Sequence, residues 1–227
     1  MKRKIIIALI LLVIVVLLFF VVSDSQTQIN EEHWQSDVGS VDKVIYGNPN
    51  ATTEIAIVIG MHPREKLAIN PEIEAVEQFA SNHNVKIILY HVNVTKNATD
   101  YQLSRANGEK LVREFVVPDI EKTNAKAVII SHSHIEGYGE GFYLATPAMD
   151  NASVKIAEKI AKTSDFNFIP TNTSKPLQAT SAIYISKPLA DAGHPTFVYE
   201  IPENITEQDS TSKAIELLNL IFNIVKD

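Results

Sequence analysis

The sequence predicts an α/β protein: a three-layer sandwich with a mixed, largely parallel central sheet, preceded by an N-terminal transmembrane helix. From residue 41 onward, short apolar runs rich in Val and Ile alternate with amphipathic stretches, an order typical of strands joined by helices. Residues 41–227 are also enough for one well-filled core and too few for two independent ones. A separate apolar run at the N-terminus indicates the transmembrane helix.

Hydrophobic periodicity gives the individual elements. Short apolar or β-branched runs predict strands at 41–46, 54–59, 85–92, 127–131, 142–145, 182–186 and 195–199. Amphipathic runs predict helices at 71–82, 105–117, 152–163 and 207–225. The alternation of the two kinds of run places helices on both faces of one sheet.

The N-terminus carries a membrane signal. Three basic residues precede eighteen consecutive apolar residues, Ile5 to Val22, which as a helix span about 27 Å. Basic residues before the run keep the N-terminus inside, so the rest of the chain is expected outside the cell. We expect an uncleaved anchor over residues 1–23, with a cleaved signal peptide as the alternative. Residues 24–40 are predicted to be a polar stalk, and residues 41–227 an extracellular domain.

Composition agrees with export. N-glycosylation acceptor sequences number six, where composition predicts about two, so a glycoprotein is expected; they begin at Asn50, Asn93, Asn97, Asn151, Asn172 and Asn204. There is no cysteine, so any metal site must use His and carboxylates. The net charge of −7 becomes −10 when the three basic residues before the apolar run are set aside (−7 − 3). An acidic exterior part of the chain argues against nucleic acid or anionic lipid as a partner.

The most informative motif follows the predicted strand 54–59. Gly60 ends that strand, and His62 and Glu65 then have the His-x-x-Glu spacing that can put an imidazole and a carboxylate on one metal ion. The spacing alone is common, but open α/β sheets bind their ligands at the carboxyl ends of their strands. A catalytic zinc needs three protein ligands and an open position. A third ligand and a general base are therefore expected at other strand ends.

Two further predicted strands end on suitable groups. The strand at 127–131 runs into His132 and His134, which lie on the same side of an extended chain. His132 is favoured as the third ligand because it comes directly after the apolar run, which leaves His134 as a contact to the substrate or to a ligand. A third β-rich run ends on Glu200, the candidate general base, with Glu203 as the alternative.

These motifs resemble the zinc metallocarboxypeptidases of the pancreatic type and their relatives, the succinylglutamate desuccinylases and aspartoacylases. The segment from Gly60 to Glu65 is similar to the family's Gly-x-His-x-Arg-Glu, and residues 132–133 are similar to its His-Ser. Residues 196–200 resemble its strand ending on the catalytic Glu, and the resemblance runs roughly over 44–227. It implies one zinc ion bound by His62, Glu65 and His132, with Glu200 as base.

The resemblance also implies substrate contacts. Arg105 falls where the family has an Asn-Arg pair that grips the substrate carboxylate, a task that suits the bidentate guanidinium. Ser104 stands in the place of that Asn, and Arg64 and His134 are further candidate contacts. Two family features have no clear equivalent: a substrate-capping Tyr before the catalytic Glu, and an oxyanion-stabilising Arg between Glu65 and Arg105.

The sequence therefore predicts a membrane-anchored, extracellular, zinc-dependent peptidase that acts on a peptide or cell-envelope peptide. Two alternatives stay open. One is an aspartoacylase-like deacylase of N-acyl amino acids, and the other is a surface binding module that keeps the fold without activity. The oligomeric state and the position of cleavage are left open.

Overall fold

The computed structural model describes residues 31–172, 174 and 179–226. The predicted membrane anchor and the first part of the predicted stalk lie outside these residues. Within the described part of the chain, no helix has both the length and the apolar composition needed to cross a membrane.

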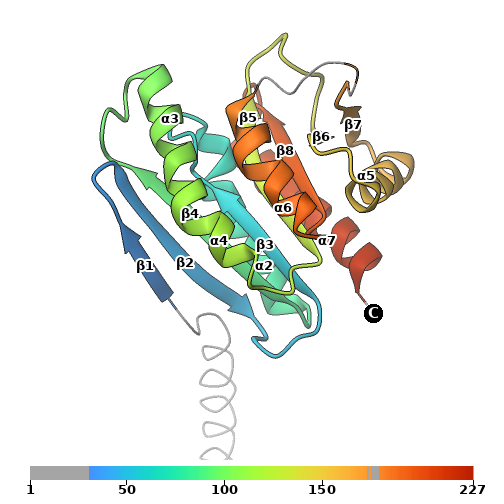
Figure 1. The fold of residues 1–227 in the computed structure, drawn as a ribbon. Coiled ribbons are helices and arrows are strands. Elements are labelled where there is room, and N and C mark those ends of the chain that lie inside the picture. Colours follow the sequence, from blue (N-terminus) through green and yellow to red (C-terminus); the bar gives the residue numbers. More distant parts are fainter. Residues whose placement is uncertain (1–30, 173, 175–178, 227) are drawn as a thin grey trace, which may run out of the picture.

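Among the residues that the structure describes, eight strands form one mixed sheet in the order β1-β2-β4-β3-β5-β8-β6-β7 (Figure 1). Their bounds are β1 Glu31–Gln35, β2 Gly39–Gly47, β3 Glu54–Ile59, β4 Lys86–Val94, β5 Ala127–His134, β6 Tyr143–Thr146, β7 Asn167–Pro170 and β8 Thr196–Pro202. Four of the seven pairings are parallel, and the central strands β4, β3, β5 and β8 all run the same way. The mixed, largely parallel sheet is therefore confirmed.

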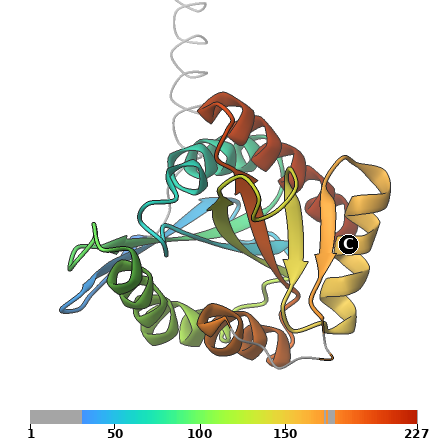
Figure 2. The same ribbon diagram turned by 90° about the horizontal axis from the view of Figure 1, so that it is seen from above.

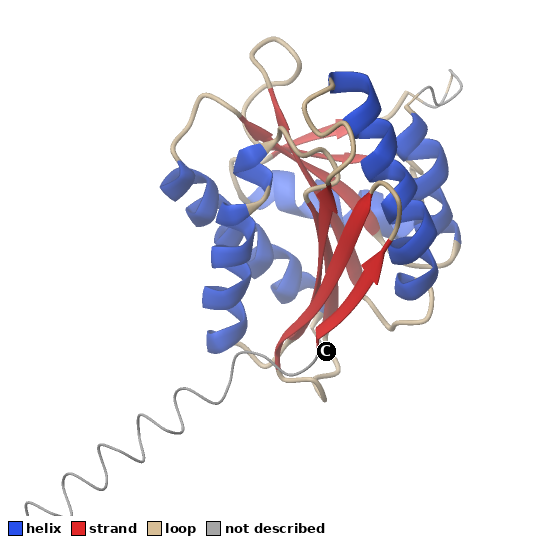
Figure 3. Ribbon diagram, turned by 90° about the vertical axis from the view of Figure 1, so that its left-hand side faces the viewer, coloured by secondary structure: helices blue, strands red, loops and turns tan. Residues whose placement is uncertain are grey.

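Helices cover both faces of the sheet and complete three layers (Figures 2 and 3). One face carries α2 (Asn70–Asn82), α5 (Asn151–Thr163) and α7 (Glu207–Val225); the other carries α3 (Tyr101–Leu111), the π-helical turn η2 (Val112–Val116), α4 (Val117–Ile120), the π-helical turn η3 (Ala182–Ser186) and α6 (Lys187–Asp191). Each face of the sheet has its own hydrophobic core, and strand β3 contributes to both. Ile55 and Ile57 face one core, and Ala56 and Val58 face the other. A strand buried on both faces explains the continuous apolar run.

Side-chain caps fix where three of the helices begin. The side chains of Asp100, Asp150 and Thr206 each accept a hydrogen bond from the backbone N–H three residues later. At Thr206 the bond is reciprocated by Asp209, which completes a capping box. The helices predicted at 152–163 and 207–225 therefore start within one residue of expectation, whereas the helix predicted from Arg105 already starts at Tyr101.

The stalk prediction is wrong for residues 31–40: residues 31–35 form β1, residues 36–38 are the turn after it, and residues 39–40 begin β2. Strand β1 pairs antiparallel with β2. Trp34 anchors it, with its ring centroid 6.5 Å from that of Tyr90 and 6.2 Å from that of Phe115 in stacked arrangements. The segment has little apolar periodicity because β1 is an edge strand with mostly exposed side chains, so polarity alone was a poor guide.

Two other segments differ from expectation. Residues 182–186 are helical, not a strand: the buried Ala182, Ile185 and Leu189 recur at helical spacing, and Pro188 sits in the first turn of α6. Strand β7 was not expected, because its side chains are largely exposed at the end of the sheet. Short runs of this kind are decided by their tertiary partners.

Helix α3 touches the loop after β3 at Gly108, where an added Cβ would lie 1.7 Å from the carbonyl oxygen of Met61. Gly108→Ala gains about 1 kcal/mol of helix propensity, but overlap with backbone atoms is expected to cost more, about 1–3 kcal/mol net. Urea denaturation of the variant and wild type measures this difference. A variant as stable as wild type would contradict the close approach of α3 to the loop.

Candidate metal and catalytic centre

Three adjacent parallel strands, β3, β5 and β8, end at the same edge of the sheet. The register pairs His132 of β5 with Glu200 of β8. Gly60 turns the chain sharply after β3 with a φ of 75°, and a Cβ there would lie 2.4 Å from a carbonyl oxygen of β4. The turn brings His62 and Glu65 over the ends of the neighbouring strands.

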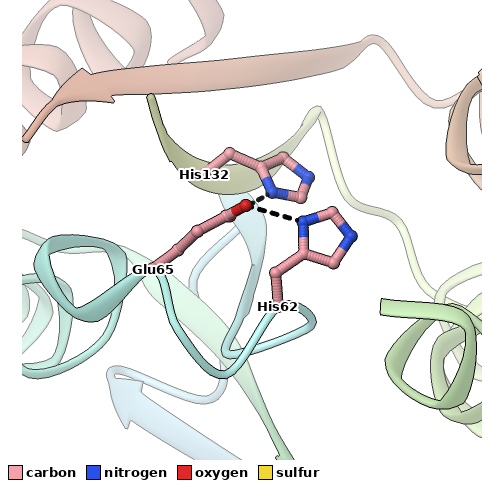
Figure 4. Close-up of side chains that lie close together, drawn as sticks. All are labelled: His62, Glu65 and His132. Atoms are coloured by element: carbon pink, nitrogen blue, oxygen red, sulfur yellow. Dashed lines mark hydrogen bonds and ion pairs between the residues drawn. The ribbon is translucent and has the colours of Figure 1, made fainter. Parts of the chain in front are cut away.

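The Glu65 carboxylate lies between two imidazoles (Figure 4). Its Oε1 is 2.9 Å from Nδ1 of His62, and its Oε2 is 2.7 Å from Nδ1 of His132. The two rings lie 4.4 Å apart between centroids, and all three side chains are almost fully buried. The backbone N–H of Ser133 also donates to Glu65 Oε2, at 3.4 Å.

The contacts between Glu65 and the two histidines shift the pKa values of the site. Burial alone would raise the pKa of Glu65, but the charges and hydrogen bonds of His132 and His62 outweigh it and hold that pKa well below its ordinary range. Burial likewise opposes charge on His62, yet its contacts with Glu109 and Glu65 raise the His62 pKa. The lowered pKa of Glu65 therefore favours its carboxylate form, which is the form that binds a metal ion.

These three residues fit a divalent metal. One ligand atom from each of His62, Glu65 and His132 lies within 4.8 Å of the others. Two imidazole nitrogens and one carboxylate oxygen are a donor set that zinc takes in catalytic sites. Both histidines turn Nδ1 toward Glu65, so the same atoms can turn to an ion held between them. The ligand group expected from the sequence is thus brought together.

His134 does not join this group within the described residues. Its Nε2 lies 3.0 Å from the carbonyl oxygen of Gly141, and its ring lies 5.3 Å from that of Tyr143 between centroids. It lines the cavity and supports the loop 135–142 that borders it. His132 and His134 lie on the same side of β5, but this does not make both of them ligands. The strand continues to His134, so His134 lies beyond the metal group.

Arg105 and Arg64, the two arginines predicted to contact the substrate, both lie at the site but have different partners. Arg105 donates from a terminal guanidinium nitrogen to Glu65 Oε1 at 2.8 Å. Arg64 is exposed at the cavity and lies with its guanidinium 5.7 Å from the Tyr101 ring centroid. Ser104 lines the cavity, but its hydroxyl donates to the carbonyl oxygen of Tyr101 in its own helix, at 3.4 Å.

Glu200 borders a cavity of about 830 Å³ that also contains the His62–Glu65–His132 group. Burial raises the pKa of Glu200 to about 7; the charge of His132 opposes this shift and that of Glu65 adds to it. A carboxyl group that changes protonation near neutral pH is suited to both taking and giving a proton. Glu203, the alternative base, instead accepts a hydrogen bond from the Ser133 hydroxyl at 3.0 Å.

Glu109 is a residue of the site that the sequence motifs do not predict. Nε2 of His62 is buried and has no hydrogen-bond partner among the described residues, and Oε1 of Glu109 lies 3.9 Å from it. Metal-bound histidines usually donate their other ring N–H to a carboxylate or carbonyl, which fixes the tautomer. The only sequence signal was helical spacing: Glu109 lies one turn after Arg105 on α3.

No protein-family model matches the chain, and no curated protein matches it. Solved structures do match. A metallo-carboxypeptidase from Burkholderia cenocepacia has a TM-score of 0.56 and 14% identity, over 83% of this chain and 65% of that one. A succinylglutamate desuccinylase from Silicibacter has a TM-score of 0.54 and 10% identity, over 88% and 68%. The cell shape determinant protein Csd4 from Helicobacter pylori has a TM-score of 0.54 and 9% identity, over 82% and 55%.

The chain therefore has the metallocarboxypeptidase-like fold that its motifs led us to expect. It spans 65% of the metallo-carboxypeptidase and 55% of Csd4, less than two thirds of each. At these identities the likeness concerns the fold, so the activity has to be argued from the site.

Glu109→Ala is expected to weaken zinc binding by about 10- to 100-fold, because it removes the carboxylate oxygen that faces Nε2 of His62 at 3.9 Å and favours this orientation of the ring. Glu109→Gln keeps an acceptor oxygen and should retain most of the affinity. Competition with a chromophoric chelator measures the dissociation constant. Glu114→Ala removes an exposed carboxylate from the next helical turn and is the matched control. Equal affinities for Glu109→Ala and this control would contradict the role of Glu109.

Proposed function

We propose that this chain is a zinc-dependent amide hydrolase that acts on peptides. One observation carries the proposal: the His62–Glu65–His132 group and Glu200 share one cavity at the ends of adjacent parallel strands. A ligand group alone would suit a storage or structural site. A nearby carboxyl group with a pKa of about 7 adds an acid and base for chemistry.

Zinc held by His62, Glu65 and His132 would acidify a water molecule and polarise the substrate carbonyl. Glu200 would take a proton from the attacking water molecule as the oxygen of that water bonds to the carbonyl carbon. When the carbon–nitrogen bond breaks, Glu200 passes the same proton to the leaving amine, and the carboxyl group returns to its starting state. Its low exposure of 9% keeps this exchange away from bulk water.

The arginines position the substrate. Arg64 has no carboxylate partner among the described residues, so its guanidinium is available to a substrate carboxylate beside the metal group. Arg105 forms an ion pair with Glu65 in this structure. Metal binding at Glu65 would weaken that ion pair and leave the Arg105 guanidinium freer to contact the substrate. Such contacts contribute by holding the carbonyl at the reacting groups.

Glu200→Gln keeps the shape of the side chain but cannot take a proton. We expect it to retain zinc and to lose amide hydrolysis by about 10²- to 10⁴-fold. Hydrolysis is measured on peptides with a free C-terminus, on the same peptides amidated, and on isopeptide-linked envelope-type peptides. Glu203→Gln is the comparison, with a much smaller loss expected. Wild-type rates for Glu200→Gln would refute the assigned base.

A deacylase of N-acyl amino acids is the second candidate, because a succinylglutamate desuccinylase shares the fold. Rates on N-acyl amino acids, measured beside the peptide panel, separate the two activities. A zinc-loaded protein that cleaves none of these substrates would instead support a binding module.

We also propose that Ile5 to Val22 anchor the protein, with the following chain outside the cell. The six acceptor asparagines support this placement, because each of them is exposed on the folded domain. Protease added to intact cells is expected to degrade the domain. Complete protection, with degradation only after lysis, would overturn this topology.

A further inference from the structure

The arginines of this protein are few and gathered in one place. Only four occur in the sequence, and one of them precedes the N-terminal apolar run. The other three, Arg64, Arg105 and Arg113, all line one of two adjoining cavities. The lysines are far more numerous, and those among the described residues belong to many different helices, strands and loops. In an acidic chain this selection of guanidinium groups indicates recognition of anionic groups, since Arg binds carboxylates bidentately.

The second cavity, which we call the α3 groove, has a volume of about 460 Å³. It shares Tyr101 and Arg105 with the catalytic cavity, so the two are continuous. From there it follows one side of α3 to Arg113 in η2. At that end the Arg113 guanidinium lies 5.5 Å from the centroid of the half-exposed Tyr184 ring.

Charge pairing singles out Arg113 within the α3 groove. Arg105 pairs with Glu65 at 2.8 Å, and Lys110 pairs with Asp37 at 2.8 Å. Glu109 faces His62. Arg113, by contrast, pairs with no carboxylate among the residues that the structure describes, and its guanidinium instead lies over the Tyr184 ring. The far end of the groove therefore presents a guanidinium without an acidic partner, beside an aromatic face.

The spacing fits one extended ligand. Arg105 and Arg113 are eight residues apart in a continuous helical segment, which corresponds to about 12 Å. An extended peptide covers about 3.3 Å per residue, so roughly three to four residues reach from one to the other. The overall charge of −7 disfavours a polyanion, whereas a single carboxylate needs only one guanidinium.

We propose that the α3 groove is a subsite for an acidic side chain of the peptide substrate, held by Arg113 and packed on Tyr184. The inference rests on the proposed function and specifies its substrate class: peptides with Asp or Glu about three to four residues from the residue that lies at Arg105. Arg105 lies between this subsite and the metal group, and it lines both the α3 groove and the catalytic cavity.

The test uses short alanine peptides with a free C-terminus, in which Glu or Gln replaces each position in turn. Calorimetric titration into the zinc-free full-length protein measures binding without hydrolysis. At one position or two adjacent ones, the Glu peptide is expected to bind about three- to tenfold tighter than its Gln twin. The difference should shrink in high salt.

Arg113→Gln is expected to abolish the Glu preference, and Arg113→Lys to keep part of it, since Lys retains the charge without the fork. Lys122→Gln is the matched control, because it removes one positive charge from an exposed site outside the groove. Loss of the preference in both Gln variants would mean that only net charge matters, and a wild-type protein without preference would also overturn the subsite.

The zinc-loaded protein separates this inference from the proposed function. With both correct, the Glu peptide is cleaved with a KM lower by the same three- to tenfold and a similar kcat. Cleavage without any preference retains the hydrolase and overturns the subsite. Binding preference without any cleavage retains the subsite and overturns the hydrolase.

Discussion

The site depends on a single carboxylate, that of Glu65. It accepts hydrogen bonds or ion pairs from His62, His132, Arg105 and the backbone of Ser133. These donors come from three parts of the chain: the loop after β3, the end of β5, and helix α3. Because the Glu65 carboxylate is buried and accepts all of these contacts, its protonation would leave buried donors unpaired, which is costly. A divalent metal ion would offer the same carboxylate a positively charged partner, so the contacts that keep Glu65 ionised also prepare it to be a ligand.

The sheet positions the metal group and Glu200, and helix α3 adds side chains that face the metal group. Parallel neighbours β3, β5 and β8 must end on the same side, which brings the metal group and Glu200 together. Helix α3 then adds Arg105 and Glu109 on one face and contacts the loop through Gly108. The same helix begins the groove to Arg113, so one element connects metal orientation with substrate selection.

Sequence patterns predicted those parts of the protein that depend on local order. The metal group and Glu200 could be found because each follows a buried run, and a buried run is visible without a structure. Glu109 could not, because its role depends on how α3 packs against the loop. Residues 31–35 and 167–170 are edge strands with exposed side chains, so no alternation marks them. The composition of residues 182–186 predicts a strand because their isoleucine and tyrosine side chains suit both states, and only the burial pattern continuing into α6 decides for a helix.

Zinc stoichiometry in two paired variants tests the metal centre most directly. Full-length wild type, His132→Ala and His134→Ala would be loaded with zinc, dialysed and assayed by atomic emission. We expect about one ion per chain in wild type and in His134→Ala, and none retained in His132→Ala. A wild-type protein without zinc, or a His134→Ala variant that loses the ion while His132→Ala keeps it, would contradict the metal centre described here.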